Sequence, residues 1–186
     1  MGRMTLFLLA VLVTTPVAAA ELAGVSMPDE VTVRGTRLVL NGLGLREWSF
    51  LRIDVYVAGL YLRERMHDPE AIIGSPGPKR LELRMVRSLD RSSIAESWAK
   101  GIRKSAGKDY PALEDRVASL NSQLTDVRRG DTVALTQIPG EGTVLEMNDK
   151  TLATVPGEDF ARALWRIWLG ATPPTIELKK GLLGAR

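Results

Sequence analysis

Residues 50–62 read FLRIDVYVAGLYL, and their alternation decides the fold class of this chain. Val55 and Val57 fall on one face of an extended segment, and Tyr56 and Leu60 fall on the other. Both faces become mainly apolar towards the end of the stretch. A strand that is apolar on both faces is covered on both sides, so we predict a central strand rather than an edge.

Segments with less pronounced patterns precede and follow this strand in the sequence. The sequence NGLGLRE (41–47) is interpreted as a loop that leads into it. Strands are predicted in 29–41 (a hairpin around 34–36), in RLELRMVR (80–87), and after Gly130 in DTVALTQI, TVLEM and TLATV. Helices are predicted in 68–73, in two segments that begin near Ser93 and at Pro111, in EDFARALWRIWLG (158–170) and in 174–180.

The order of these elements is strands, then helices, then strands and helices again, without regular alternation. That order predicts an α+β domain in which an antiparallel sheet is covered by helices on one face. Residues 21–186 are predicted to form this single domain, which is long enough to bury an adequate core.

The first 20 residues have the features of a secretory signal peptide. Arg3 precedes a short apolar run from Leu6 to Val13, and the run Ala18-Ala19-Ala20 forms a cleavage site. An apolar run of this length is shorter than the ~20 residues that a spanning helix needs. We therefore expect cleavage after Ala20, a periplasmic or secreted location, and no integral membrane segment in the mature chain.

Composition excludes several classes of function. The formal net charge is only +3 without a basic cluster, so no nucleic-acid interface is expected. The chain has no cysteine and one histidine, His67, in a polar loop, so neither a metal site nor a catalytic triad is expected. The segment NGLGLRE lacks the third glycine of a phosphate-binding motif, and no cofactor is predicted.

Asp54 is the one carboxylate placed within an apolar strand. Because a buried carboxylate is costly unless it is paired, we interpret Asp54 as a structural counter-charge for Arg52 or Arg46 rather than as a catalytic group.

The segments NGLGLRE, RIDVYVAGLYL, PGPKRLELRMVR and SSIAESWAKGI occur in an order that resembles the chalcone isomerase-like superfamily, in particular its bacterial exported branch. The later segments FARALWRIWLG and LKKGLLG resemble the same family. The resemblance covers about residues 31–184 and implies an open-faced β-sandwich with a ligand cleft between sheet and helices. It also implies one of three roles: chalcone cyclisation, fatty-acid binding, or a non-catalytic role.

The resemblance assigns the family's pocket arginine to Arg46, which follows the glycine in GLR. In the enzymes this arginine stabilises an oxyanion, and in the fatty-acid binders it pairs with the carboxylate. Tyr56, three residues before the glycine of AGLYL, matches the tyrosine of the fatty-acid binders, where the enzymes have threonine.

The enzymes also use a tyrosine and an asparagine on a helix, and a threonine on the last long helix. The resemblance places Ile94, Gly101 and Ile167 at these positions. None of the three has a polar side chain, which makes chalcone cyclisation doubtful.

Three hypotheses follow. The first is a binder of a fatty acid or similar apolar anion, held by Arg46 and Tyr56 in a cleft lined by Trp98 and Ile167, with Trp165 and Trp168 as further candidates. The second is an isomerase (an intramolecular lyase) on a chalcone-like or other substrate. The third is a structural domain whose cleft is filled and whose Arg46 is paired with a carboxylate.

Overall fold

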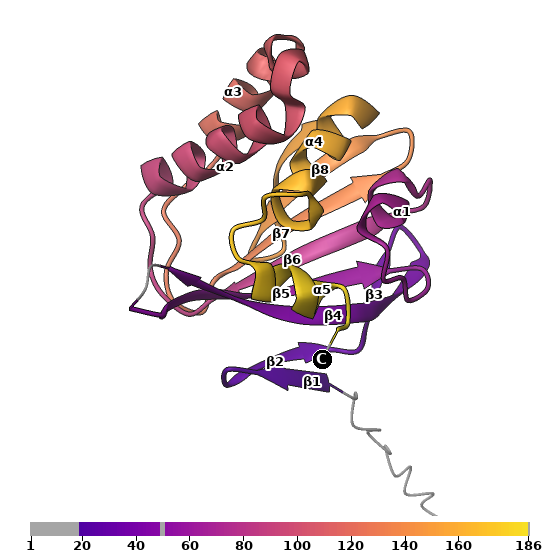
Figure 1. Ribbon diagram of the computed structural model, residues 1–186, viewed down its shortest axis with the longest axis vertical. Coiled ribbons are helices and arrows are strands. Elements are labelled where there is room, and N and C mark those ends of the chain that lie inside the picture. Colours follow the sequence, from indigo (N-terminus) through magenta and orange to yellow (C-terminus); the bar gives the residue numbers. More distant parts are fainter. Residues whose placement is uncertain (1–18, 49–50, 186) are drawn as a thin grey trace, which may run out of the picture.

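The computed structural model describes residues 19–48 and 51–185, and its main feature is one curled antiparallel sheet. The seven strands lie in the sheet in the same order as in the chain (Figure 1). They are β3 (Glu30–Val33), β4 (Thr36–Trp48), β5 (Ile53–Leu62), β6 (Lys79–Met85), β7 (Thr132–Ile138), β8 (Gly142–Met147) and β9 (Lys150–Val155). Helices complete the α+β fold, as predicted.

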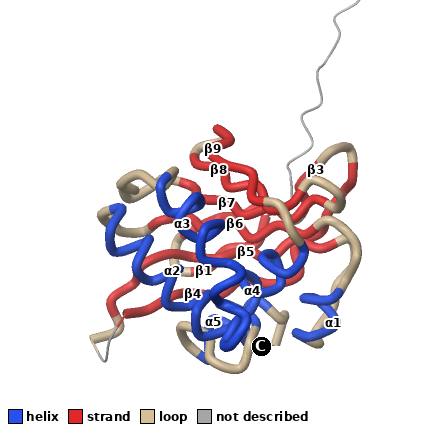
Figure 2. The backbone as a smooth tube through the Cα atoms, turned by 90° about the horizontal axis from the view of Figure 1, so that it is seen from above, coloured by secondary structure: helices blue, strands red, loops and turns tan. Residues whose placement is uncertain are grey.

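The helices gather on one face of this sheet, as Figure 2 shows from above. They are α1 (Pro69–Gly74), α2 (Arg91–Ala106), the 3-10 helix η1 (Gly107–Leu113), α3 (Glu114–Ser122), α4 (Glu158–Leu169) and α5 (Ile176–Leu182). Apolar side chains from this face of the sheet and from the helices form the larger core, which includes Leu60, Leu81, Trp165 and Trp168. Burial of this apolar surface is the dominant force that holds the layers together.

A small hairpin covers part of the opposite face. Its strands are β1 (Ala19–Leu22) and β2 (Val25–Pro28), and they were not predicted. Met27 is fully buried in a second core with Leu38, Val57 and Tyr61. This cover explains why β5 is apolar on both faces, and the interior position of β5 confirms that prediction.

Most predicted elements are present, with two differences. Residues 41–47 were interpreted as a loop but belong to β4. The helix expected from Pro111 begins instead at Glu114, because Pro111 lies inside a 3-10 turn that carries Tyr110 and Leu113 into the core.

The glycines of 41–47 have a packing role that keeps this segment in the sheet. A Cβ at Gly42 would overlap the carbonyl oxygen of Gly181, and one at Gly44 would overlap that of Leu178. The backbones of β4 and α5 therefore approach closely, as glycine allows. We call this contact the glycine seam, formed by Gly42, Gly44, Leu178 and Gly181.

The C-terminal helix is held at two further places. The side-chain amide of Asn41 donates to the carbonyl oxygen of Leu182 at 2.8 Å, and Lys179 Nζ donates to that of Gly170 at 2.8 Å. Together with the seam, these bonds fix α5 against β4 and against the end of α4.

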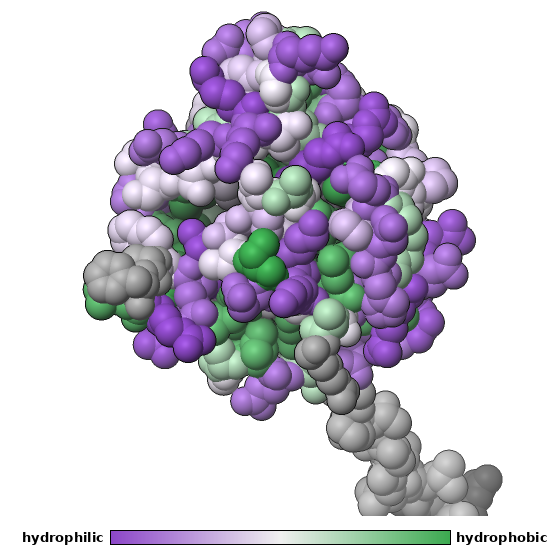
Figure 3. Space-filling view, viewed as in Figure 1, coloured by the Kyte–Doolittle hydropathy of each residue, from purple (hydrophilic) through white to green (hydrophobic). Residues whose placement is uncertain are grey.

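Other predictions for the chain lie partly outside the described residues. The predicted signal peptide falls mainly on residues 1–18, outside the described part, whereas Ala19 and Ala20 pair with Pro28 and Met27 in the small hairpin. Among the described helices, none is both long and apolar enough to cross a bilayer. On the face in Figure 3 the surface is largely polar, and apolar side chains are scattered between polar ones.

Candidate functional site

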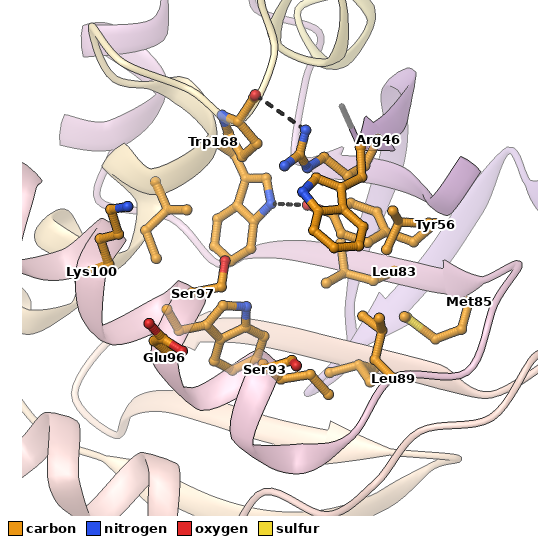
Figure 4. Close-up of a pocket in the computed structure, with 17 residues that line it drawn as sticks. Arg46, Tyr56, Leu83, Met85, Leu89, Ser93, Glu96, Ser97, Lys100 and Trp168 are labelled. Carbon is orange, nitrogen blue, oxygen red and sulfur yellow. Dashed lines mark hydrogen bonds between the residues drawn. The ribbon is translucent and has the colours of Figure 1, made fainter. Parts of the chain in front are cut away.

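A cavity of about 470 Å³ lies between the helix-covered face of the sheet and helices α2 and α4. Its walls come from four strands, two helices and two connecting segments, and they are mainly apolar (Figure 4). The lining residues are Arg46 and Trp48 from β4; Val55 and Tyr56 from β5; Leu83, Met85, Leu89 and Val133 from the sheet and its connections; Ser93, Ile94, Glu96, Ser97, Trp98 and Lys100 from α2; and Ile167, Trp168 and Pro174 at the C-terminal side.

Arg46 provides a positive charge at one side of this cavity. One terminal nitrogen of its guanidinium, Nη1, donates to the carbonyl oxygens of Glu47 and Pro174, the latter at 3.3 Å. No carboxylate lies within ion-pair distance of Arg46 in the described part of the chain. The predicted pairing of Arg46 with a carboxylate, such as that of Asp54, is therefore wrong, because Arg46 contacts the backbone carbonyl of Glu47 instead.

Tyr56 lies directly opposite Arg46 in the register of β4 and β5. Its hydroxyl oxygen accepts a hydrogen bond from Nε1 of Trp168 at 3.0 Å. Burial raises the pKa of Tyr56 to about 12, although the bond from Trp168 and the charge of Arg46 act in the opposite direction. The phenol is thus protonated at neutral pH, and its proton is free to be donated.

A β-bulge brings two consecutive residues of β5 to the cavity. Arg46 pairs with Tyr56 but Glu47 pairs with Asp54, so Val55 is the extra residue. Alternation predicted Val55 on the opposite face from Tyr56, and that prediction is wrong because a bulge interrupts the period of two. Both residues line the cavity.

Two indoles form the part of the wall next to Tyr56. The rings of Trp98 and Trp168 are nearly perpendicular, at 79°, and their centroids are 6.1 Å apart. Ile167 lines the same wall and is 8% exposed. Trp165, a further candidate, is buried in the core and does not line the cavity.

The four predicted ligand-binding residues, Arg46, Tyr56, Trp98 and Ile167, thus share one cavity, and their role in binding stays a prediction. Sequence reasoning missed Trp48 and Pro174. Trp48 lies two residues beyond Arg46, on the same face of β4, and would have been found if 41–47 had been interpreted as a strand. Pro174 carries no sequence signal, because its carbonyl reaches Arg46 only through the placement of α5.

The three positions that the resemblance matched to polar residues of the chalcone-cyclising enzymes carry no polar side chain here. Ile94 lines the cavity with its apolar side chain. Gly101 faces Ile167 so closely that a Cβ at 101 would lie 3.0 Å from Cγ1 of Ile167. A larger residue at 101 therefore requires Ile167 to move.

Asp54 is not the buried counter-charge that was predicted. It is exposed at the end of β5, and Arg52 pairs instead with Glu47, with Nε 2.9 Å from a carboxylate oxygen. The bulge at Val55 separates Asp54 from the cavity wall. No group of three or more acidic or histidine side chains suited to a metal occurs among the described residues.

Comparison with known proteins agrees with the fold. A sequence model of the family described as chalcone isomerase-like matches residues 19–184. The fold is similar to the crystal structure of a fatty-acid binding protein from Arabidopsis thaliana, with a TM-score of 0.72 and 19% identity over 89% of this chain and 96% of that one. No match was found among curated proteins. Since the family match spans the whole described domain, this chain belongs to the chalcone isomerase-like family.

Proposed function

We propose that this protein binds a fatty acid or a similar apolar anion, with the acidic head group at Arg46 and Tyr56. The observation that carries the proposal is the pairing of these two residues across β4 and β5, at one side of an otherwise apolar cavity. Figure 4 shows both side chains reaching the cavity beside Trp168.

Charge and hydrogen bonding favour an anion at this place. A guanidinium that is partly removed from water is more stable with a negative partner, and Arg46 has none among the described residues. Arg46 can donate two parallel N–H bonds to a carboxylate, and the Tyr56 hydroxyl has a proton to donate. A carboxylate accepts all three bonds, so it suits this donor set.

The remaining walls suit a hydrocarbon chain. About 470 Å³ lies within the range of small-molecule sites, and Leu83, Met85, Val133 and Ile167 provide apolar surface. Burial of the chain contributes roughly 25 cal/mol per Å² of apolar area. The structural similarity to a protein whose name records fatty-acid binding supports the same class of ligand.

Displacement of a fluorescent fatty acid tests the proposal. Replacing Arg46→Ala removes a charge-assisted contact, which contributes about 1.5–3 kcal/mol, so palmitate affinity is expected to fall roughly 10- to 100-fold. Arg46→Lys keeps the positive charge but loses the pair of parallel N–H donors, so this variant is expected to bind palmitate with intermediate affinity. Arg37→Ala is the matched control, because Arg37 lies on the same strand, is exposed and pairs with Glu30.

The ligand offers a second control that needs no variant. Methyl palmitate has the same chain without the charge, and we expect it to bind the wild-type protein as weakly as palmitate binds Arg46→Ala. Equal affinity for palmitate in the wild type and in Arg46→Ala would falsify the assignment of the head group to Arg46.

We also propose that the chain is exported and cleaved after Ala20, on the strength of residues 1–20 alone. Cleavage there would separate Ala19 and Ala20 from the rest of β1, while Glu21 and Leu22 would keep their pairing with β2. Mass determination of the protein isolated from a periplasmic fraction tests this, and an intact N-terminus in the cytoplasm contradicts it.

A further inference from the structure

The wall of the cavity contains a polar group that the proposed function does not use, the indole N–H of Trp98. Trp98 is only 6% exposed and lines the cavity. The Nε1 atom of Trp98 donates to no atom of the described residues. Unlike Nε1 of Trp165, it is not a fully buried nitrogen that lacks a partner. The N–H is therefore not sealed in the core, and because Trp98 lines the cavity, a group inside the cavity can accept its hydrogen bond.

The other two indoles of the core provide a direct comparison. Trp168 Nε1 is occupied by the hydroxyl of Tyr56 at 3.0 Å. Trp165 Nε1 has no partner either, but it is fully buried and Trp165 lies outside the cavity. Of these three tryptophans, only Trp98 thus presents an unused donor to a ligand.

A plain hydrocarbon chain fits this donor poorly. Before a ligand binds, water can accept from the Trp98 N–H, and a methylene chain that displaces this water leaves the donor unpaired. Displacing a bonded water without replacing its bonds reduces affinity. A ligand with an oxygen at this point restores the bond, and such polar matches discriminate strongly between analogues.

The place of the oxygen along the ligand follows from the order of the side chains. Arg46 and Tyr56 hold the head group, Trp168 contacts Tyr56, and Trp98 lies one indole further, with ring centroids 6.1 Å apart. Ser97 adds a hydroxyl to the same wall and points towards Trp168 in Figure 4. The donor is therefore close to the acidic end of the ligand and far from its terminal methyl group.

We propose that the preferred ligand is an oxygenated fatty acid, with a hydroxyl or keto oxygen in the half of the chain nearer to the carboxylate, bound by the Trp98 N–H. This inference rests on the proposed function and adds a selectivity to it. Trp98 would then determine which fatty acids are preferred, in addition to lining the cavity.

Competition with a fluorescent fatty acid tests the inference with three probes: palmitate, β-hydroxypalmitate and ω-hydroxypalmitate. One hydrogen bond corresponds to about a fivefold change in affinity. We therefore expect β-hydroxypalmitate to bind about fivefold more tightly than palmitate. The ω-hydroxy acid, whose oxygen lies at the wrong end, is expected to show no such gain.

Two variants assign the effect to the N–H. Trp98→Phe keeps an aromatic wall without the donor and is expected to abolish the preference while palmitate still binds. Trp165→Phe removes an unpaired indole N–H outside the cavity and is expected to keep the preference, so it is the matched control. If Trp98→Phe fails to fold, the three probes still decide the question on the wild-type protein.

The outcomes separate the two proposals. Equal affinity for palmitate and β-hydroxypalmitate overturns the oxygenated ligand and leaves fatty-acid binding in place. A preference that persists in folded Trp98→Phe overturns the role of this residue. Failure of all three acids to bind the wild-type protein overturns the proposed function, and this inference falls with it.

Discussion

At the scale of single residues, the arrangement of Tyr56 and Trp168 makes one hydroxyl serve two purposes. The oxygen accepts from the indole, and the proton remains for the cavity. Because the indole fixes the hydroxyl oxygen from one side, the remaining proton is directed to other acceptors. The Tyr56 hydroxyl is therefore already oriented by Trp168, which under the proposed function reduces the entropy lost on binding.

Tyr56→Phe removes both functions of this hydroxyl. We expect palmitate affinity to fall roughly two- to tenfold, since one neutral hydrogen bond is lost. Stability is expected to fall by about 1–3 kcal/mol because the Trp168 N–H is left without its partner. Fluorescence displacement and urea unfolding measure the two effects.

Tyr61→Phe is the control for this variant. Tyr61 lies on the opposite face of β5, and its hydroxyl donates to the carbonyl oxygen of Pro28 at 3.0 Å. It is expected to lower stability without changing affinity. A loss of affinity in Tyr61→Phe equal to that in Tyr56→Phe would show that general destabilisation, not the hydroxyl in the cavity, explains the result.

At the scale of elements, the glycine seam connects the packing of α5 to the geometry of the site. The seam fixes α5 on β4, and the segment just before α5 contains Pro174, whose carbonyl accepts from Arg46. Lys179 ties the same helix to Gly170, at the end of the helix that carries Trp168. Both sides of the proposed head-group site thus depend on where α5 lies.

Gly44→Ala places a methyl group against the carbonyl oxygen of Leu178 and forces α5 away from β4. Overpacking of this kind costs typically about 1–3 kcal/mol, and we expect a stability loss in that range. Palmitate affinity is also expected to fall several-fold, because Pro174 moves with the helix. Thermal unfolding and displacement titration measure both.

Gly74→Ala is the matched substitution, since a Cβ at Gly74 meets nothing within 4 Å. It is expected to change neither quantity appreciably. If Gly44→Ala lowers stability but leaves affinity untouched, α5 does not position the head-group site.

The seam also explains why part of the sequence was misinterpreted. The strands after Gly130 and the helix at 158–169 could be predicted because their patterns are local. The segment 41–47 looked like a loop because glycine is unfavourable inside a strand, and its reason for being there is a contact with α5 far along the chain. The bulge at Val55 was hidden for a similar reason, since a bulge depends on pairing with β4.

The features of the candidate site likewise divide into those that could be predicted from the sequence and those that could not. Arg46, Tyr56 and Ile167 were chosen from a resemblance and Trp98 as an apolar residue of the expected cleft, and all four line one cavity. The bond from Trp168 to Tyr56 and the carbonyl of Pro174 could not be predicted, because each depends on how a late element packs on an early strand. Residue types could therefore be predicted, whereas the pairing of donors and acceptors required the folded structure.

At the scale of the whole molecule, stability depends on pH through groups remote from the cavity. Lys79 is fully buried, and its ammonium donates to the carbonyl oxygens of Ser75 at 2.8 Å and Ile73 at 3.4 Å. Burial lowers its pKa from 10.5 to about 8. Burial also raises the pKa of Tyr56 from 10.0 to about 12 and raises that of Tyr61.

These shifts predict a maximum of stability near pH 10. Between pH 8 and 10 the unfolded state keeps the proton of Lys79 that the folded state has lost, so the free energy of unfolding rises with pH. Above pH 10 the unfolded state loses the tyrosine protons that the folded state retains, so the free energy of unfolding falls. Urea unfolding at constant ionic strength from pH 7 to 11 measures both slopes.

Lys79→Met is expected to remove the rise between pH 8 and 10 and to keep the fall above pH 10. A rise of the same size in this variant would contradict the assignment to Lys79.

The order of strands in the sheet has a consequence for how the chain reaches its native state. Each strand of the sheet pairs with its neighbour in sequence. All these pairings except that of β6 with β7 close short loops, and we expect those that close short loops to form early. The docking of α5 on β4 joins the two ends of the domain and closes the longest loop, so we expect it to form last. Arg46 receives the Pro174 carbonyl only at that step, so a newly made chain can be compact before its candidate site is complete. If the proposed function holds, ligand binding therefore reports that folding is complete.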